Sequence, residues 1–333
     1  MAYLDAARDR RGIWWDFYTR AGYSTEWVTA YVGAALATLG DDRATQLSHA
    51  VWNALRRRRW MAGGWGYSAP VPPDADSTLW ALRLAEAIGQ GRSRRAARAY
   101  RFLLRHVQAN GGVATYAAAG PLRRYTRFLP GVSFEGWCGA QPCVTAAAAL
   151  LPSFAAREQA LAFLRRTQAA DGSWPSIWWC DREVATALAA EALANSGQPD
   201  DAARVRSAVA WGRARLAPEG GVPTPLQPAG SPFASAWMVR LLTLGSDLEA
   251  VESTAHWLIG RQRPDGAWEP SAAMRIPHPS DTTPATYAGL AVVDGGGAGT
   301  LALDRRACFT TATVLAALSR AWSVGRWSDR DAF

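Results

Sequence analysis

Apolar and polar positions define two kinds of helix that alternate along the chain. Amphipathic, basic helices are expected at 43–60, 93–108, 153–168, 200–216 and 248–262. Helices that are apolar almost all round are expected at 25–39, 76–88, 144–151, 184–195, 233–244 and 309–321. The apolar period is close to 3.6 residues, and no convincing β alternation occurs. A helix that is apolar all round must be buried, so the second kind predicts inner helices and the first kind outer ones.

Six short glycine-containing segments, called stations here, separate an outer helix from the next inner helix. They recur about every 50 residues and end at Trp14, Trp65, Val113, Trp174, Val222 and Trp268. A repeat array argues against two unrelated domains. The pattern predicts an all-α fold, a single (α/α)6 toroid domain over residues 1–333, with residues 1–11 as the short sixth outer piece. An open solenoid is the alternative.

A serine or threonine stands near the start of each inner helix. We expect these residues in N-cap or first-turn positions, at Thr25, Thr78, Thr145, Thr186, Ser235 and Thr310. The distance from station to hydroxyl is 11 to 13 residues in four repeats, but 32 in the third and 42 in the sixth. Loops this long are usually functional or disordered. Because units three and six oppose each other in a ring of six, segments 114–143 and 269–307 are predicted to roof one mouth.

The composition narrows the classes of function. The net charge is +8, and all 36 basic residues are arginine. Clustered arginines predict a solvated outer face rather than a nucleic-acid site, and an anionic substrate such as a diphosphate is a further interpretation. The sequence has no run of 18 apolar residues, so no transmembrane helix is predicted. The charged first residues do not resemble a signal peptide, so a cytoplasmic location is expected. Four cysteines without CxxC spacing argue against a disulfide framework.

Two carboxylates, Asp74 and Asp76, stand at the start of the second inner helix. Ser77 and Thr78 already supply hydroxyls there, so the acids are interpreted as additions that the helix start does not need. Favourable charges at a helix N-terminus are the simpler explanation. Paired carboxylates in a cleft also push pKa values apart, which suits an acid. Asp76 is therefore the predicted acid and Asp74 its neighbour, provided that burial and repulsion outweigh the helix dipole.

Aromatic and polar residues near the same mouth form the predicted substrate site. Aromatic faces stabilise cations by about 0.5–2 kcal/mol each. The candidates are Trp65, Tyr67, Trp137, Trp178, Trp179, Asp181, His278 and Tyr287, whereas Trp174 and Trp268 are assigned to packing. For Asp181 and Glu183, an ion pair with Arg182 or a neighbouring arginine is the alternative. Cys138, Asp181 and His278 are a conceivable zinc set, but they lack a ligand-spacing motif, so no metal site is predicted.

Several motifs resemble those of one superfamily. Gln168–Trp174, Gln262–Trp268 and a degraded Gln108–Gly112 resemble the Gln-Trp motifs of squalene–hopene and oxidosqualene cyclases, whose repeat also occurs in class II diterpene cyclases and protein prenyltransferase β subunits. The segment from Asp74 to Thr78 is similar to the Asp-x-Asp-Asp-Thr motif of class II cyclases. The resemblance implies a toroid fold and makes Asp76 the acid that protonates an alkene or epoxide. Ser77 departs from the last Asp of that motif.

The resulting prediction is a class II terpene-cyclase-like enzyme. It would bind an apolar, isoprenoid-like small molecule in an aromatic-lined cavity and need no cofactor, although a diphosphate substrate could bring Mg²⁺. The alternatives are a zinc-dependent prenyltransferase-like enzyme, a toroid glycosidase or lyase, and a non-catalytic partner subunit. The glycosidase alternative requires Asp76 and a second acid such as Asp181 to face each other across the mouth. The partner-subunit alternative requires a mouth without buried acids.

Overall fold

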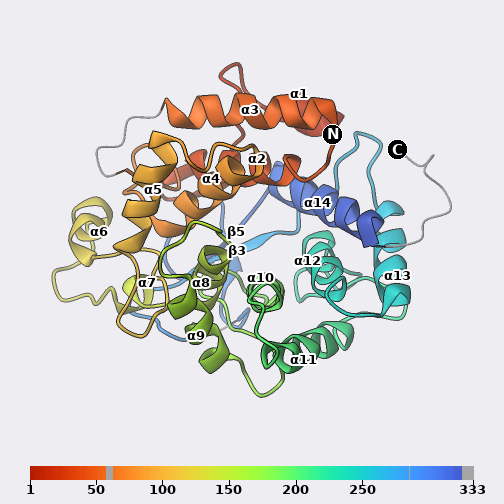
Figure 1. Ribbon diagram of the computed structural model, residues 1–333. Coiled ribbons are helices and arrows are strands. Elements are labelled where there is room, and N and C mark those ends of the chain that lie inside the picture. The colour runs from red at the N-terminus through yellow and green to blue at the C-terminus, as the bar shows by residue number, and fades with distance from the viewer. Residues whose placement is uncertain (58–62, 285, 325–333) are drawn as a thin grey trace.

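Six inner helices form a closed ring in the computed structural model, which describes residues 1–57, 63–284 and 286–324. They are α2 (Glu26–Leu36), α4 (Ala75–Ala87), α8 (Pro142–Ala149), α10 (Glu183–Ala194), α12 (Pro232–Leu242) and α14 (Cys308–Val324). Each contacts the next around the centre of the molecule, and α14 contacts α2 (Figure 1). The predicted toroid is therefore confirmed, and the open-solenoid alternative is wrong.

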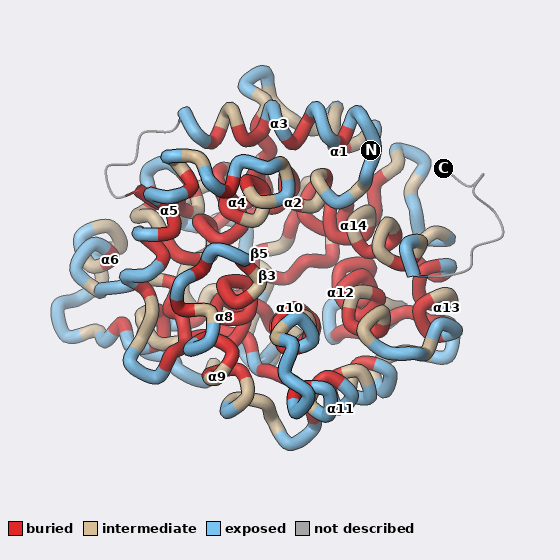
Figure 2. Tube along the Cα trace, in the orientation of Figure 1, coloured by how far each residue is buried: buried red, intermediate tan, exposed pale blue. Residues whose placement is uncertain are grey.

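The outer helices lie around this ring. They are α1 (Ala2–Ala7), α3 (Asp42–Arg56), α5 (Arg94–Leu104), α9 (Arg157–Thr167), α11 (Asp201–Arg213) and α13 (Leu248–Ile259). The inner helices are buried along most of their length, and the outer helices bury one face (Figure 2). Helix α1 packs on α14, as expected for the sixth outer piece. The predicted end of one outer helix at residue 60 lies outside the described residues. Among those residues, no helix has the length and apolarity to cross a membrane.

One hydrogen bond recurs in all six repeats. The backbone N–H that ends each station donates to a hydroxyl in the first turns of the following inner helix, at 2.8 to 3.3 Å. The acceptors are Thr29, Thr78, Thr145, Thr186, Ser235 and Thr311. Thr25 is the N-cap of α2 and Thr310 lies in the first turn of α14, as predicted, but the acceptors of this bond in repeats one and six are the neighbouring Thr29 and Thr311.

The station tryptophans also tie each inner helix to an outer one. The indole N–H groups of Trp14, Trp65, Trp174 and Trp268 donate to the carbonyl of a leucine ten residues earlier. The assignment of Trp174 and Trp268 to packing therefore agrees with the structure. Trp65 makes the same bond, to Leu55, and is fully buried. Its geometry is that of a packing residue, in contrast to the cavity position expected for it.

Short elements cover one end of the ring. The first long segment contains α6 (Ala119–Thr126) and α7 (Glu135–Cys138), and the second contains β3 (Ala273–Ile276), β4 (Ala291–Val292) and β5 (Thr300–Leu303). Strand β5 lies between β3 and β4, antiparallel to β3 and parallel to β4. Strands β1 (Asp16–Thr19) and β2 (Gly22–Ser24) form a hairpin that contacts β5. These strands were not predicted, because they lie in segments whose composition indicates loops.

The two long segments meet each other over the ring. The backbone N–H groups of Gly136 and Trp137 donate to the Pro279 carbonyl, and the Trp137 indole donates to Pro277. Only glycine fits at position 136, because a Cβ atom there would lie 2.0 Å from the Asp281 carbonyl oxygen. The predicted roof of two loops over one mouth is confirmed, and the name roof is used below for segments 114–143 and 269–307.

Candidate active site

A small cavity lies inside the ring beneath the roof. Its free space is about 10 Å³, enough for about one water molecule. It is lined by Tyr31, Asp76, Trp80, Cys143, Trp178, Trp179, Val184, Leu188, Trp237 and Phe309. Within the described parts of the chain, Asp76 is the one carboxyl group in this lining. We call this space the acid chamber.

Asp74 caps helix α4. Its Oδ1 accepts the backbone N–H of Ser77 at 2.7 Å, and its Oδ2 accepts the Ser77 hydroxyl at 2.8 Å. The interpretation of Asp74 as an addition that the helix start does not need was wrong, because this carboxyl group is the N-cap. The residue is 3% exposed. Burial raises its pKa to about 8, the Ser77 N–H opposes this, and the nearby Asp76 raises it further.

Asp76 lies in the first turn of α4, beside Asp74, and faces the acid chamber. Burial raises its pKa to about 7, although the Trp80 and Trp27 indoles stabilise the charged form and oppose the rise. Burial, rather than repulsion from Asp74, is therefore the main cause of the shift. A carboxylic acid that keeps its proton near neutral pH is suited to donate that proton.

Aromatic rings pack densely around Phe309 on α14. Its ring stacks on Tyr31 with centroids 3.6 Å apart and lies 4.9 Å from Trp27 and 5.5 Å from Trp179. Phe233 also lies within 5.9 Å of this ring. Three of these rings, those of Tyr31, Trp179 and Phe309, line the acid chamber and can stabilise positive charge without acting as nucleophiles. Most of the chamber wall is therefore aromatic or aliphatic, with Asp76 as its acidic group.

The predicted tryptophans divide between the chamber and the roof. Trp178 and Trp179 both line the chamber, and the Trp178 indole donates to Thr115. Trp137 instead packs in the roof against Phe134, and its ring centroid lies 5.6 Å from that of Trp178. Trp137 therefore packs on Trp178 from the roof and is not itself part of the chamber lining.

Two other predicted residues lie outside the chamber lining. Tyr67 donates its hydroxyl to the Phe17 carbonyl, and its ring centroid lies 6.3 Å from that of Trp27. His278 is exposed, and its Nδ1 lies 2.7 Å from the Ser280 hydroxyl. His278 thus lies on the outside of the roof.

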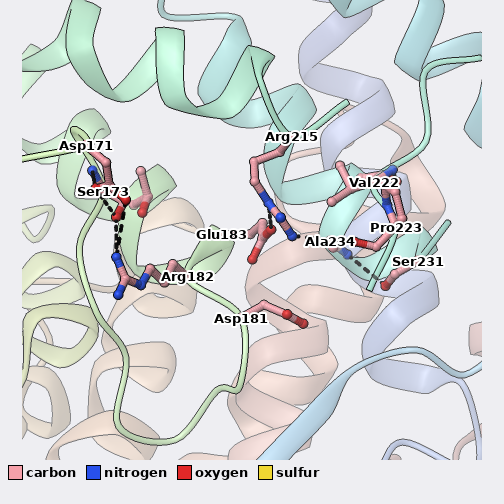
Figure 3. Close-up of polar contacts among 12 residues, drawn as sticks. Asp171, Ser173, Asp181, Arg182, Glu183, Arg215, Val222, Pro223, Ser231 and Ala234 are labelled. Atoms are coloured by element: carbon pink, nitrogen blue, oxygen red, sulfur yellow. Dashed lines mark hydrogen bonds and ion pairs between the residues drawn. The ribbon is translucent and has the colours of Figure 1, made fainter. Parts of the chain in front are cut away.

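Asp181 and Glu183 lie at the start of α10, near the roof (Figure 3). Asp181 accepts the Tyr287 hydroxyl at 2.6 Å, and Glu183 accepts from Arg215 at 3.1 Å. Arg182 instead points toward Asp171 and Ser173. The ion-pair alternative therefore holds for Glu183, with Arg215 as its partner. Burial raises the pKa of both acids, to about 7 for Glu183.

Neither the glycosidase arrangement nor the zinc set is assembled. Asp76 lines the chamber, whereas Asp181 is not part of its lining and is bound to Tyr287. Over residues 1–57, 63–284 and 286–324, no three His, Cys, Asp or Glu side chains come close enough to hold a metal ion. Cys138, Asp181 and His278 therefore do not form a common site.

Most of the chamber wall was not predicted from the sequence. Tyr31, Trp80, Trp237 and Phe309 line the chamber but lie on inner helices that were assigned only to the core. A usable signal was the helical spacing, because Trp80 lies four residues after Asp76 and so occupies the same helix face.

One roof residue near the two acids was also missed. Burial raises the pKa of Tyr116 well above its usual value, and the charges of Asp74 and Asp76 raise it further. This tyrosine of the first roof segment therefore lies close to both carboxyl groups.

A larger hollow opens at the opposite end of the ring, where the inner helices end. Its volume is about 440 Å³. Tyr31 and Trp80 line both this hollow and the acid chamber, and their rings meet edge to face with centroids 4.5 Å apart. The substrate site was predicted at the roofed mouth, but the larger space lies at the unroofed end.

Comparisons with known proteins agree with this architecture. The family model of the squalene-hopene cyclase C-terminal domain matches residues 151–281. The type II terpene cyclase MstE from Scytonema is 42% identical, with a TM-score of 0.93 over 97% of this chain and 96% of that one. A protein from Actinoplanes is 40% identical, with a TM-score of 0.90 over 96% of each chain. A sequence search of curated proteins gives no match.

A more distant relative shares the fold. The ent-copalyl diphosphate synthase from Streptomyces platensis is 19% identical, with a TM-score of 0.62, and this chain covers 50% of it. The closed helical ring and the carboxylic acid among aromatic rings define a class II cyclase. The chain belongs to the type II terpene cyclase family, as its similarity to MstE over nearly the whole length of both chains shows.

Proposed function

We propose that Asp76 donates the proton that starts cyclisation of a prenylated small molecule. The observation that carries this proposal is the single carboxyl group in the wall of the acid chamber, with a pKa raised to about 7 by burial. Protonation of a terminal alkene or epoxide leaves a carbocation. The rings of Trp80, Trp179 and Phe309 would stabilise this cation while the chain closes on itself.

Asp74 supports the acid indirectly. Both of its oxygens are engaged by Ser77, so it holds the first turn of α4 and thereby the position of Asp76. Ser77 stands where the family motif has another aspartate. In this chain Ser77 holds the Asp74 carboxyl group in place through its backbone N–H and its hydroxyl. Asp74 is thus a positioning residue in the proposal rather than a proton donor.

A geranylgeranylated aromatic acid is the substrate class we favour. MstE has been solved with geranylgeranyl dihydroxybenzoate as substrate and with merosterolic acid A as product. The hollow of about 440 Å³ in this chain is within the usual size range for small-molecule sites. A prenyl tail entering there would reach Asp76 once the rings of Tyr31 and Trp80 move apart.

The Asp76→Asn variant tests the acid. With geranylgeranyl dihydroxybenzoate as the probe, turnover followed by mass spectrometry should fall about 100- to 10,000-fold, the usual contribution of a general acid. Asp42→Asn is the matched control, because Asp42 is also a first-turn acid but is exposed on the outer helix α3. Undiminished turnover by Asp76→Asn would remove the proposal, and loss of turnover in both variants would point to a general defect.

Metal removal tests the cofactor prediction. Proton transfer from a carboxylic acid requires no metal ion. We therefore expect turnover of geranylgeranyl dihydroxybenzoate to be the same in EDTA as in Mg²⁺. With a diphosphate substrate, Mg²⁺ could still matter by binding the phosphates, so geranylgeranyl diphosphate is the comparison. A requirement for Mg²⁺ with the carboxylate substrate would contradict the proposed chemistry.

A further inference from the structure

Two buried carboxyl groups outside the acid chamber hold the first turn of helix α14. Asp16 belongs to β1 and is 1% exposed, and Asp304 follows β5 and is fully buried. Asp16 accepts the backbone N–H of Cys308 at 3.0 Å, and Asp304 accepts that of Thr310 at 2.7 Å. Phe309, whose ring lines the chamber, is the residue between these two donors. The backbone is therefore fixed on both sides of an aromatic residue of the chamber wall.

Asp16 connects two segments that are 290 residues apart in the sequence. Its Oδ1 accepts the backbone N–H groups of Phe17 at 3.2 Å and Arg306 at 3.0 Å, and its Oδ2 accepts that of Cys308. A carboxyl group can accept several such bonds because both of its oxygens carry lone pairs. One side chain thereby joins the hairpin of β1 and β2 to the turn that precedes α14.

The backbone is strained in both segments that Asp16 joins. Phe17 has a φ of 46° and Ala307 a φ of 51°, and Arg127 is the one other non-glycine residue with positive φ in the part of the chain that the structure describes. A left-handed φ is costly for a residue with a Cβ atom and persists only where the surroundings enforce it. Phe17 donates its own N–H to Asp16, and Ala307 lies between two further donors to the same carboxyl group. Asp16 is therefore well placed to enforce both conformations.

The strained segments bring two aromatic rings together. The Phe17 ring is fully buried and meets that of Phe309 edge to face, with centroids 5.2 Å apart. The Phe17 ring also lies 5.3 Å from Trp27 and 6.2 Å from Trp179. Phe17 is not part of the chamber lining, so it supports the wall from outside the chamber. A shift in either strained segment would therefore move the Phe309 ring relative to Trp179.

We propose that Asp16 is a positioning residue, which fixes the Phe309 ring in the chamber wall and thereby limits where the cyclisation can stop. This inference rests on the proposed function, because it assumes that a carbocation forms in the chamber. An aromatic face stabilises a cation only at close range, so a displaced ring leaves part of the reaction path unsupported. A cation that is left unsupported loses a proton from the neighbouring carbon to water, and the electrons of that C–H bond form the alkene of an incompletely cyclised isomer.

The products of the Asp16→Asn variant test this role. Asparagine keeps one acceptor oxygen but presents an NH2 group in place of the other, so at least one backbone donor loses its acceptor. With geranylgeranyl dihydroxybenzoate as the substrate, chromatography and NMR distinguish the fully cyclised product from its isomers. We expect the ratio of incompletely to fully cyclised product to increase about three- to tenfold, in line with the loss of one hydrogen bond. The KM should stay unchanged, because Asp16 lines neither the chamber nor the hollow.

Two further variants separate positioning from general stability. Asp201→Asn is the matched control, because Asp201 is also 1% exposed but binds Arg165 between the outer helices. This control should lower the free energy of unfolding and leave the products unchanged. Adding Ala307→Gly to Asp16→Asn should restore most of the fully cyclised product, because glycine adopts a positive φ without a steric cost. Asp16→Glu, which displaces the carboxyl group by one methylene, provides the same measurements if Asp16→Asn does not unfold cooperatively.

A spectroscopic measurement reports on the ring itself and needs no substrate. The full chain is labelled with 4-fluorophenylalanine, and the ¹⁹F NMR resonance of Phe309 is assigned by its absence from Phe309→Leu. Asp16→Asn should shift or broaden this resonance, and the added Ala307→Gly should return it toward its original position. Asp201→Asn should leave the resonance unchanged.

The outcomes distinguish the positioning role from the proposed function. An unchanged Phe309 resonance in Asp16→Asn, an unchanged product ratio from an active chain, or the same changes in Asp201→Asn would overturn the positioning role. A resonance that changes in Asp16→Asn and recovers with Ala307→Gly would support the positioning of the ring even if the unsubstituted chain cyclised no geranylgeranyl dihydroxybenzoate. Such a lack of cyclisation would remove the proposed substrate alone.

Discussion

The proposed role of Asp76 predicts that activity depends on pH. In that role the neutral carboxylic acid is the proton donor, and its pKa is raised to about 7. The turnover rate at saturating substrate should therefore be constant well below pH 7 and fall about tenfold per pH unit above it. Rates measured from pH 5.5 to 9 would show the bend. A rate that increases from pH 6 to pH 8 would contradict the role of Asp76 as acid.

The same burial predicts a pH-dependent stability. Asp74 and Asp76 retain protons to about pH 8 and pH 7, whereas unfolded aspartate releases its proton near 3.8. Between these values the folded state binds more protons than the unfolded chain, so their contribution to stability is present at low pH and is lost as pH rises. Urea unfolding at pH 5 and pH 8 should show a smaller decrease for the double variant Asp74→Asn, Asp76→Asn than for the unsubstituted chain.

At this scale the sequence predicted Asp76 but not the function of its neighbour. The motif and the apolar helix that follows it were enough to select the carboxyl group that lines the acid chamber. The alignment of the repeats led to a wrong interpretation of Asp74, because Ser77 and Thr78 occupy positions where a hydroxyl could cap the helix. Only the geometry shows that Asp74 is the cap and that Thr78 instead accepts the Trp65 N–H.

The hydrogen bond between each station and the next inner helix is expected to stabilise every repeat. Its contribution to stability can be tested in repeat four. Thr186 accepts the N–H of Trp174, which is fully buried. Thr186→Val keeps the shape but leaves that donor without a partner, which should lower the free energy of unfolding by about 1–3 kcal/mol. Thr186→Ser retains the hydroxyl and is the control. Equal urea midpoints for the valine and serine variants would show that the bond contributes little.

Element positions could be predicted well because apolar periodicity decides which helices are buried. The register within two repeats could not, since Thr25 and Thr29, or Thr310 and Thr311, offer the same hydroxyl chemistry. The short strands were missed for another reason. Strand β3 pairs with β5 across a long intervening loop, and β1 contacts β5 from the other end of the sequence. Local patterns carry little information about such contacts.

The roof is the part of the whole molecule that would exclude water from the chamber. Arg275, only 2% exposed, donates from β3 to the carbonyls of Ile177 and Ser176, just before Trp178. Arg275→Ala should loosen this connection, admit water and increase the share of hydroxylated, incompletely cyclised products. Reaction in ¹⁸O-labelled water followed by mass spectrometry would measure that share.

The control for this prediction lies in the same roof. Arg305 pairs with Asp294 at the surface, and both side chains are about half exposed. Arg305→Ala should therefore leave the products unchanged. If the Arg275 and Arg305 variants gave the same product distribution, the proposed exclusion of water by this connection would be wrong.

Loop lengths predicted which mouth is roofed, but not which end stays open. That depends on how the side chains fill the ring: aromatic rings nearly close the space at the Asp76 end, whereas charged side chains leave a hollow at the other. Side-chain packing of this kind has no local sequence signal. The assignment of residues 1–333 to one domain stays a prediction that the closed ring of the described helices supports.

The small volume of the acid chamber has a consequence for how substrates are selected. Its free space holds about one water molecule. Tyr31 and Trp80 line both this chamber and the hollow at the unroofed end. For a tail that enters from the hollow, these two rings must separate before the tail reaches Asp76. Selection among substrates would then depend on how far the aromatic rings can move, rather than on the volume of the closed chamber.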